Sequence, residues 1–270
     1  MKTSEVATTT NNKGDEMLLT PTLDKLRELK FRGMLKCLEQ QLNSAAVKKL
    51  SFEERLSLLV DEELLDRENR RLNSRLRQAS LKQRACVEDI DFKHPRNLDR
   101  STIMNLKKCK WIKEHHNILI TGLTGVGKSY IACALGHNAC LEGYRSLYVR
   151  ASRLLADLAV ARGDGRYEKI MKSISKVDLL VLDDWGLNKL NEQERRDFLE
   201  IMEDRYDLKS TIITSQVPVK KWHELIGDST IADAILDRLV HNSYRLELKG
   251  ESMRKNKNEN EAKVKNKKTE

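Results

Sequence analysis

The spacing of apolar residues differs between the first and second parts of the chain. From Thr20 onward, leucines recur near the period of an amphipathic helix, at Leu23, Leu26, Leu29, Leu35, Leu38 and Leu42. Pro21 suits the first turn of such a helix. Ser51-Phe52-Glu53-Glu54 has the pattern of a capping box and predicts a further helix that runs towards residue 80. We therefore expect a small all-helical domain at residues 16–75.

In the second part, short apolar runs alternate with helical segments. Strands are expected at 117–121, 146–150, 177–183, 210–215 and 243–248. This alternation predicts an α/β fold, a parallel sheet flanked by helices that binds its ligand at the carboxyl ends of the strands. The α/β domain would span residues 76–254 and include a packed connector at 85–116. Residues 1–15 and the basic tail 255–270 are polar and expected to be disordered.

Composition narrows the class of protein. The 270 residues include 50 Lys and Arg against 41 Asp and Glu, a formal net charge of +9, which favours an anionic partner such as nucleic acid. No apolar run is long enough to span a bilayer, so no membrane association is expected. The five cysteines form no C-x-x-C pair and are interpreted as reduced thiols of a cytoplasmic protein. His115-His116 lacks a third metal ligand nearby.

One glycine-rich stretch carries the clearest chemistry. Residues 122–129 match the phosphate-loop pattern G-x-x-x-x-G-K-[ST] between an apolar strand and a helix, and comprise Gly122, Leu123, Thr124, Gly125, Val126, Gly127, Lys128 and Ser129. The glycines allow the main chain to wrap around phosphates, and the helix N-terminus favours anionic oxygens. Lys128 would reach the β- and γ-phosphates, and Ser129 would bind Mg²⁺. The stretch predicts an ATP site.

Two strand ends would complete that site. The apolar run Leu179–Leu182 leads into Asp183 and Asp184, as a Walker B strand requires. Asp183 would hold Mg²⁺, and Asp184 would orient the attacking water. Because adjacent strand residues point to opposite faces, a two-metal nuclease is disfavoured. At the end of the strand 210–215, Ser215 or Gln216 would sense the γ-phosphate, although a simple strand-end turn explains them nearly as well.

Basic residues gather where the helical part ends. Between Asp66 and Arg84 there are seven of them against two acidic ones: Arg67, Arg70, Arg71, Arg75, Arg77, Lys82 and Arg84. On one continuous helix all seven fall within about half of the circumference. Such a stripe is typical of contacts with a phosphate backbone, but a solvated helix face explains it equally well. The absence of aromatic residues there disfavours single-strand binding.

The motif set resembles one branch of a known superfamily. GLTGVGKS, LLVLDDWG, STIITSQ, AILDRL and ESMRK are similar to the IstB/DnaC-like branch of the AAA+ P-loop ATPases. Within this branch, the N-terminal helices and VEDIDF resemble the IstB-like helper ATPases of insertion-sequence transposition, over residues 20–254. The resemblance makes Arg238 an arginine finger directed to a neighbouring subunit and Arg254 a sensor II residue. From the residues alone, an ion pair on the surface explains Arg238 equally well.

The resemblance further implies a basic insertion after the second strand that contacts DNA, with Arg153, Arg162, Arg166, Lys169 and Lys172. Arg205 resembles a position near the subunit interface and receives no role. The expected function is an ATP- and Mg²⁺-dependent ATPase that forms a homo-oligomer on duplex DNA and assists an IstA-like transposase. The alternatives are a DnaC-like helicase loader that prefers single strands, a nucleotide-switched architectural protein, and a P-loop small-molecule kinase.

Overall fold

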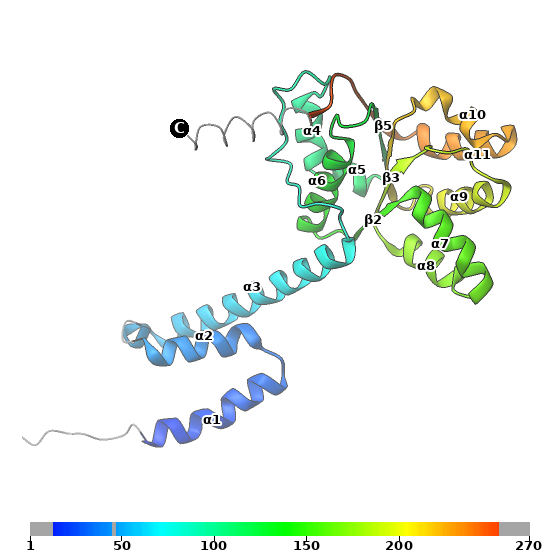
Figure 1. Cartoon of the computed structure of the whole chain (residues 1–270). Helices are drawn as coiled ribbons and strands as arrows, with labels where there is room; N and C mark the ends of the chain where they lie inside the picture. Colours follow the sequence, from blue (N-terminus) through cyan, green and yellow to red (C-terminus); the bar gives the residue numbers. More distant parts are fainter. Residues whose placement is uncertain (1–12, 45–46, 254–270) are drawn as a thin grey trace, which may run out of the picture. The chain divides into compact units, whose positions relative to one another are not determined.

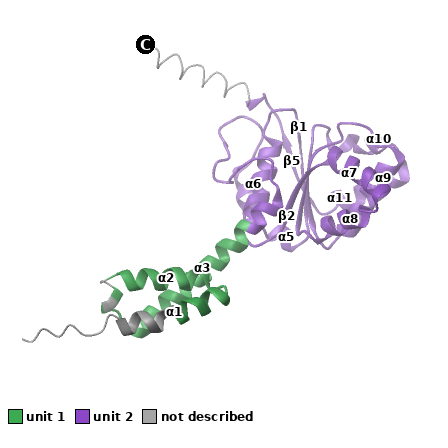
Figure 2. Ribbon diagram, turned by 60° about the horizontal axis from the view of Figure 1, so that its bottom comes forward, with its two compact units in different colours: residues 1–73 green, residues 74–270 purple. Residues whose placement is uncertain are grey.

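The computed structural model describes residues 13–44 and 47–253 and divides the chain into two compact units, Met1–Asn73 and Ser74–Glu270 (Figures 1 and 2). The division falls between residues 73 and 74, where the sequence suggests 75 and 76. In the described ranges no helix is both long and apolar enough to cross a membrane. Residues 1–12 of the expected disordered N-terminus, the expected disordered tail and Arg254 lie outside the described residues.

The first unit is helical, as predicted. It contains α1 (Lys13–Glu28), α2 (Arg32–Asn43), a short 3-10 helix (Val47–Lys49) and most of α3 (Phe52–Ala79). The capping box is confirmed, because Ser51 N donates to Glu54 Oε2 at 2.8 Å and Glu54 N donates to Ser51 Oγ at 3.2 Å. The expected place of Pro21 is wrong: α1 begins earlier, so this proline lies inside the helix, where it removes one main-chain hydrogen bond.

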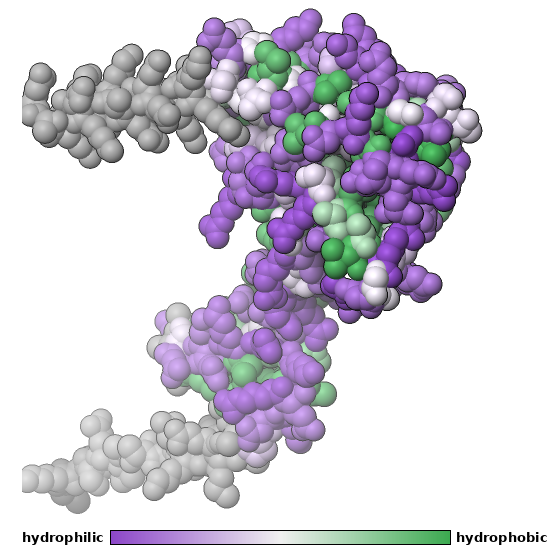
Figure 3. All heavy atoms as spheres, turned by 45° about the vertical axis from the view of Figure 1, so that its right-hand side comes forward, coloured by the Kyte–Doolittle hydropathy of each residue, from purple (hydrophilic) through white to green (hydrophobic). Residues whose placement is uncertain are grey.

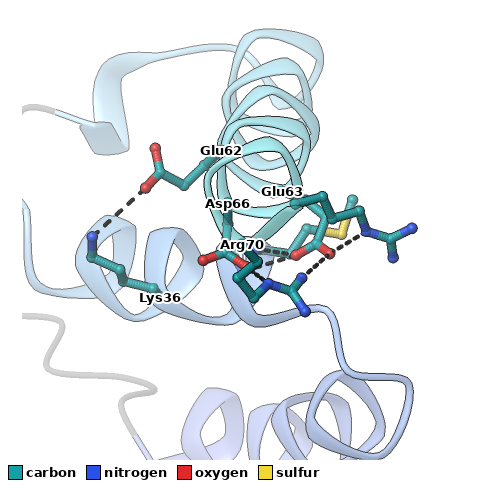
Figure 4. Close-up of polar contacts among 8 residues, drawn as sticks. Lys36, Glu62, Glu63, Asp66 and Arg70 are labelled. Atoms are coloured by element: carbon teal, nitrogen blue, oxygen red, sulfur yellow. Dashed lines mark hydrogen bonds and ion pairs between the residues drawn. The ribbon is translucent and has the colours of Figure 1, made fainter. Parts of the chain in front are cut away.

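A buried carboxylate joins α2 to α3 (Figure 4). Glu63 Oε2 accepts hydrogen bonds from the main-chain N–H groups of Gly33 at 2.8 Å and Met34 at 3.3 Å, in the first turn of α2. A Cβ at Gly33 would lie 2.4 Å from the Glu62 carbonyl oxygen, so only glycine permits this close approach of the two helices. The contact keeps the small unit together although much of its apolar surface stays exposed.

The second unit is built on a five-stranded sheet in which every pair of neighbours is parallel. The strands are β1 (Asn117–Gly122), β2 (Ser146–Arg150), β3 (Leu179–Trp185), β4 (Ser210–Ser215) and β5 (Ser243–Leu248), in the order β2-β3-β4-β1-β5. The predicted parallel sheet is confirmed. The order places the carboxyl end of β4 directly beside that of β1, where the glycine-rich loop begins, and the carboxyl end of β3 one strand further along.

Helices cover both faces of this sheet (Figure 1). One face carries α4 (Arg100–Lys107), α5 (Lys110–Lys113) and α6 (Lys128–Leu141). The other face carries α7 (Ala151–Asp164), α8 (Tyr167–Lys176), α9 (Glu192–Arg205), α10 (Trp222–Ile226) and α11 (Ser229–Val240). Alternate residues of each strand enter opposite cores; Ile118 and Ile120 join the first and Leu119 the second. The sheet is therefore buried on both faces and holds its strand ends in fixed positions.

The connector is packed against the first core, as predicted. Val87, Ile90, Ile103, Leu106 and Trp111 are buried there. The chain after β5 contacts both the connector and the glycine-rich loop. Lys249 N donates to Arg96 O of the connector at 3.0 Å, and Met253 N donates to Gly125 O of the loop at 3.0 Å. Two segments far apart in the sequence thus meet at this loop.

Candidate nucleotide-binding site

The glycine-rich loop joins the carboxyl end of β1 to the N-terminus of α6. Gly125 and Gly127 have φ values of 89° and 96°, in the left-handed region that favours glycine. A Cβ at Gly125 would lie 2.0 Å from Ser252 Oγ, and a Cβ at Gly127 would lie 2.4 Å from Arg96 Nη1. Both glycines are therefore required by the main-chain conformation and by the packing behind the loop. The predicted strand–loop–helix context is confirmed.

Lys128 begins α6 and folds back over the loop. Its Nζ donates to the Leu123 carbonyl oxygen at 2.9 Å, and the residue is 6% exposed. The ammonium group therefore lies within the loop, where a phosphate-loop lysine meets the β- and γ-phosphates.

Asp183 is the most densely hydrogen-bonded carboxylate of the site. Its oxygens accept from Ser129 Oγ at 2.7 and 3.0 Å, from Thr214 Oγ1 at 2.6 Å and from the Tyr148 hydroxyl. Lys82 Nζ lies 3.3 Å from Asp183 Oδ2. Burial alone would raise the pKa of Asp183, but the hydroxyl donors outweigh it and hold this pKa below its ordinary value. The residue is an anion at neutral pH.

The pairing of Ser129 with Asp183 fits a magnesium ion. A hydroxyl from α6 and a carboxylate from β3 lie in direct contact at the start of the phosphate-binding helix. Mg²⁺ prefers oxygen ligands and takes only one or two from the protein beside those of substrate phosphates and water. The residues present therefore suit the predicted metal position.

Asp184 differs sharply from its neighbour. It has φ of 58°, and its N–H donates to Thr214 Oγ1 at 3.1 Å. The pairing of β3 with β4 shifts register between Leu182 and Trp185. Both carboxylates lie on β3, as expected, but the strand is irregular at Asp184. Within the described ranges the Asp184 carboxylate makes no hydrogen bond, and the residue is partly exposed.

The end of β4 distinguishes the two proposed phosphate sensors. Ser215 is fully buried, donates to the Trp185 carbonyl at 2.8 Å and accepts from Val217 N at 3.1 Å, so its hydroxyl serves the strand-end turn. Gln216 Oε1 instead accepts from Thr124 Oγ1 at 2.8 Å. Of the two, only Gln216 contacts the loop.

Arg238 lies at the amino ends of the strands, opposite to the end of the sheet that carries the phosphate loop. Its carbonyl oxygen accepts from Asn117 Nδ2 at 3.3 Å, at the amino end of β1, whereas the phosphate loop follows the carboxyl end of this strand. The guanidinium donates to Glu203 Oε1 at 3.0 Å and lies over the Tyr206 ring. Arg238 thus cannot serve the nucleotide of its own subunit, and it makes the ion pair that the sequence left open.

Arg205, which resembles an interface position, is a buried structural residue. It is 1% exposed and donates to Thr211 Oγ1 and to three main-chain carbonyls, those of Ile174, Val177 and Ser210. Burial lowers its pKa to about 9. This side chain joins α8, α9 and β4 from within.

The basic stripe is shorter than predicted. α3 ends at Ala79, so Lys82 and Arg84 do not belong to it, and Lys82 turns instead to Asp183. Three of the remaining arginines already have partners. Arg70 contacts Glu63 (Figure 4), Arg67 contacts the same carboxylate, and Arg75 Nε donates to the Cys140 carbonyl at 2.9 Å. Arg71 and Arg77 are exposed, and their side chains contact no described residue by hydrogen bond or ion pair.

The basic insertion forms the helical pair α7–α8. Arg162 pairs with the buried Asp197 of α9 and lies over the Tyr167 ring, so its role is structural. Arg166 pairs with Asp164, and Lys172 with Glu168. Arg153, with 83% of its side chain exposed, and Lys169 remain on the surface.

Four residues of the site escaped sequence reasoning. Tyr148 and Thr214 lie on strands beside β3, and their hydroxyls carry no motif. Lys82 follows the end of α3 and Arg96 lies in the connector, and only the fold brings them to the strand ends. Of these four residues, only Thr214 could have been recognised from the sequence, because it is a polar residue within an apolar strand.

Comparisons with known proteins agree with this geometry. The sequence model of the family described as IstB-like ATP binding protein matches residues 24–262. The insertion sequence ATP-binding protein y4pL of Sinorhizobium fredii (strain NBRC 101917 / NGR234) is 52% identical over 240 residues, 89% of this chain and 98% of that protein. The ATP-binding protein of insertion sequence IS1162 from Pseudomonas fluorescens is 48% identical over 203 residues, 75% of this chain and 88% of its own length.

Solved structures support the same fold. The DnaC helicase loader aligns with a TM-score of 0.50 and 23% identity, over 61% of this chain and 96% of its own. AMPPCP-bound DnaA from Aquifex aeolicus aligns with a TM-score of 0.52 and 22% identity, over 63% of this chain and 51% of that one. At this identity the likeness shows the fold alone and says nothing about partners.

Proposed function

The chain belongs to the IstB-like ATP-binding protein family, and from this premise we propose that it is an ATPase that assembles on duplex DNA and assists the transposase of an insertion sequence. The observation that supports ATP chemistry most directly is the Ser129–Asp183 contact behind a glycine-rich loop. The names of the relatives support the association with an insertion sequence. The family also supports an ATPase over a small-molecule kinase.

Each residue of the site has a task in hydrolysis. The loop amides and Lys128 bind the β- and γ-phosphates of ATP. Ser129 and Asp183 would hold Mg²⁺, which when bound would supply positive charge to the phosphate oxygens. Asp184, which is partly exposed, orients a water for attack on the γ-phosphorus, and the bond between this phosphorus and the ADP oxygen breaks. Gln216 donates to the γ-phosphate from the end of β4.

Hydrolysis would depend on assembly. Arg238 lies at the far edge of the sheet, so it meets a γ-phosphate only in a neighbouring subunit and leaves Glu203 when it does so. Apolar side chains of the first unit are exposed, and Leu29 and Phe52 are 61% and 73% exposed. Hydrophobic patches interrupt the polar surface of the protein in Figure 3. Such exposed apolar surface supports contacts between copies of the chain. A homo-oligomer with nucleotide between subunits is the arrangement that these features favour.

Duplex DNA would meet exposed basic side chains. Arg71 and Arg77 on α3 and Lys169 on α8 are exposed and make no ion pair within the described ranges, and Arg153 on α7 makes only a long, exposed ion pair of 3.9 Å with Asp157, so all four suit a phosphate backbone. Arg162 does not, because it serves Asp197. The cysteines are free in the structure, which supports a reducing, cytoplasmic setting.

Binding to labelled duplex DNA, with and without ATP and against excess single strand, tests the proposal. Cooperative, ATP-dependent binding that resists the competitor is expected. Lys128→Ala should lose the ATP dependence, and Arg71→Glu with Arg77→Glu should weaken binding without affecting ATP affinity. Loss of the signal to single strand would favour a helicase loader, and absence of binding to both would refute both DNA functions. Unchanged DNA binding in Asp184→Asn together with negligible hydrolysis in the native protein would indicate an architectural role.

A further inference from the structure

Arg96 of the connector is a fully buried arginine that touches the phosphate loop. Its side chain donates from Nη1 to the Val126 carbonyl at 2.9 Å and from Nη2 to the Asp91 carbonyl at 2.8 Å, and Nη1 lies 3.1 Å from Met253 Sδ. Among the described residues Nε has no hydrogen-bonding partner. The residue is 2% exposed. Among the described residues, this buried cation is thus held by neutral acceptors alone.

The charge of Arg96 is poorly compensated within the protein. In the described ranges no carboxylate lies within ion-pair distance of it, and Asp91 acts on it only at longer range. Burial lowers the pKa of Arg96, while Asp91 and Tyr130 oppose that shift, and a guanidinium stays protonated in proteins. Burying an unpaired charge is costly, so native proteins pair such groups. The anionic partner that this position lacks is what a phosphate-binding loop brings.

The hydrogen bond to Val126 also orients the loop. The chain has no cis peptide bond in the described ranges, and in a trans peptide the C=O and the following N–H point in opposite directions. Arg96 and Met253 hold the carbonyls of Val126 and Gly125 from outside the loop. The N–H groups of Gly127 and Val126 therefore face away from these two residues.

We propose that Arg96 is a positioning residue for the nucleotide, which keeps the loop amides directed to the β-phosphate and supplies a buried positive charge that the phosphates of a nucleoside di- or triphosphate neutralise. The inference rests on the proposed nucleotide site. It assigns to the connector a part in binding that no phosphate-loop motif contains. Gly127 reflects the same contact, since a side chain there would displace the guanidinium.

The test compares Arg96→Met, which removes the charge and donors at similar length, with Arg96→Lys, which keeps the charge. Affinities for ATP and ADP with Mg²⁺ are measured by calorimetry, and thermal unfolding is followed with and without nucleotide. We expect Arg96→Met to bind both nucleotides about tenfold more weakly, since the one hydrogen bond from this charged donor to the loop, at Val126, is lost. The midpoint temperature of thermal unfolding of Arg96→Met without nucleotide should stay at the wild-type value or rise. Arg96→Lys should recover most of the affinity.

Two results would overturn this inference. One is wild-type affinity for both nucleotides in Arg96→Met; the other is a fall in nucleotide-free stability with no recovery of affinity in Arg96→Lys. If Arg96→Met does not fold, Arg96→Gln, which keeps a donor without the charge, takes its place under the same criteria. Lys128→Ala and the native protein are measured beside them. If the native protein binds neither nucleotide, the proposed function fails, whereas native binding with unaffected Arg96 variants refutes the role of Arg96 alone.

Discussion

The two ends of the central sheet use the same kinds of residue in opposite ways. At the amino end, the buried Arg205 places all its donor nitrogens on four oxygens. At the carboxyl end, the buried Arg96 leaves Nε without a partner and has no close anion among the described residues. Satisfied buried groups make a structure rigid, whereas incompletely satisfied ones carry a free-energy cost that a ligand relieves. The comparison separates the end that stabilises the fold from the end that binds.

The largest effect is expected at the carboxyl end. Lys128→Ala removes the ammonium that lies within the loop, so ATP binding should fall at least about a hundredfold and ATP-dependent assembly should disappear. The fold should be unaffected, because the first turn of α6 keeps its main-chain hydrogen bonds. Equilibrium binding of ATP and sedimentation with and without ATP measure both effects. Unaltered assembly would show that the loop is not the nucleotide site.

Arg238→Ala tests whether Arg238, at the amino end of the sheet, acts on the ATP of a neighbouring subunit. ATP binding should be near the native value, whereas turnover in the assembled state should fall by about a thousandfold, the scale typical of an arginine finger. Steady-state hydrolysis on duplex DNA measures it. Glu203→Gln is the matched control, because it frees the guanidinium without removing it and should leave hydrolysis intact. Full hydrolysis in Arg238→Ala would place the finger elsewhere.

Arg205→Ala sharpens the contrast with Arg96. It leaves three buried carbonyls and the Thr211 hydroxyl without this donor and creates a cavity, so the free energy of unfolding should fall by about 3 kcal/mol. Nucleotide affinity measured well below the transition should not change. Urea unfolding without nucleotide provides the first value and calorimetry the second. A loss of affinity in the folded variant would contradict the division between the two ends.

The smallest effect concerns acid stability at the amino end. Burial raises the pKa of Asp178. Lys209 at 2.7 Å and the Arg145 N–H at 2.9 Å lower this pKa by a larger amount, so it lies below its ordinary value of 3.8. A depressed carboxylate pKa stabilises the fold above the unfolded-state pKa, and this contribution is lost as pH falls through the folded-state value. Below a pH of about 4, the free energy of unfolding of Asp178→Asn should therefore decrease less with falling pH than that of the native protein. The difference between the two decreases should be less than about 1 kcal/mol. An identical acid limb would show that the pair contributes nothing.

Much of the site could be predicted from local sequence. The loop, Lys128, Ser129 and Asp183 lie within two short segments whose residue types follow from the geometry of a strand that enters a helix. The five strands were also predictable, because a sheet covered on both faces requires continuous apolar runs. These features depend on neighbours in the chain, and periodicity reports such neighbours directly.

The roles of the arginines could not be predicted in the same way. Arg162, Arg205 and Arg96 look alike in sequence, yet the fold places them against Asp197, against four oxygens, and against the phosphate loop. Lys82, counted in a helical stripe, reaches Asp183 instead. By itself the sequence determined the α/β fold and the elements of an ATP site. Only the tertiary structure decided which charges are free to bind, because the environment of a long polar side chain comes from segments distant in the chain.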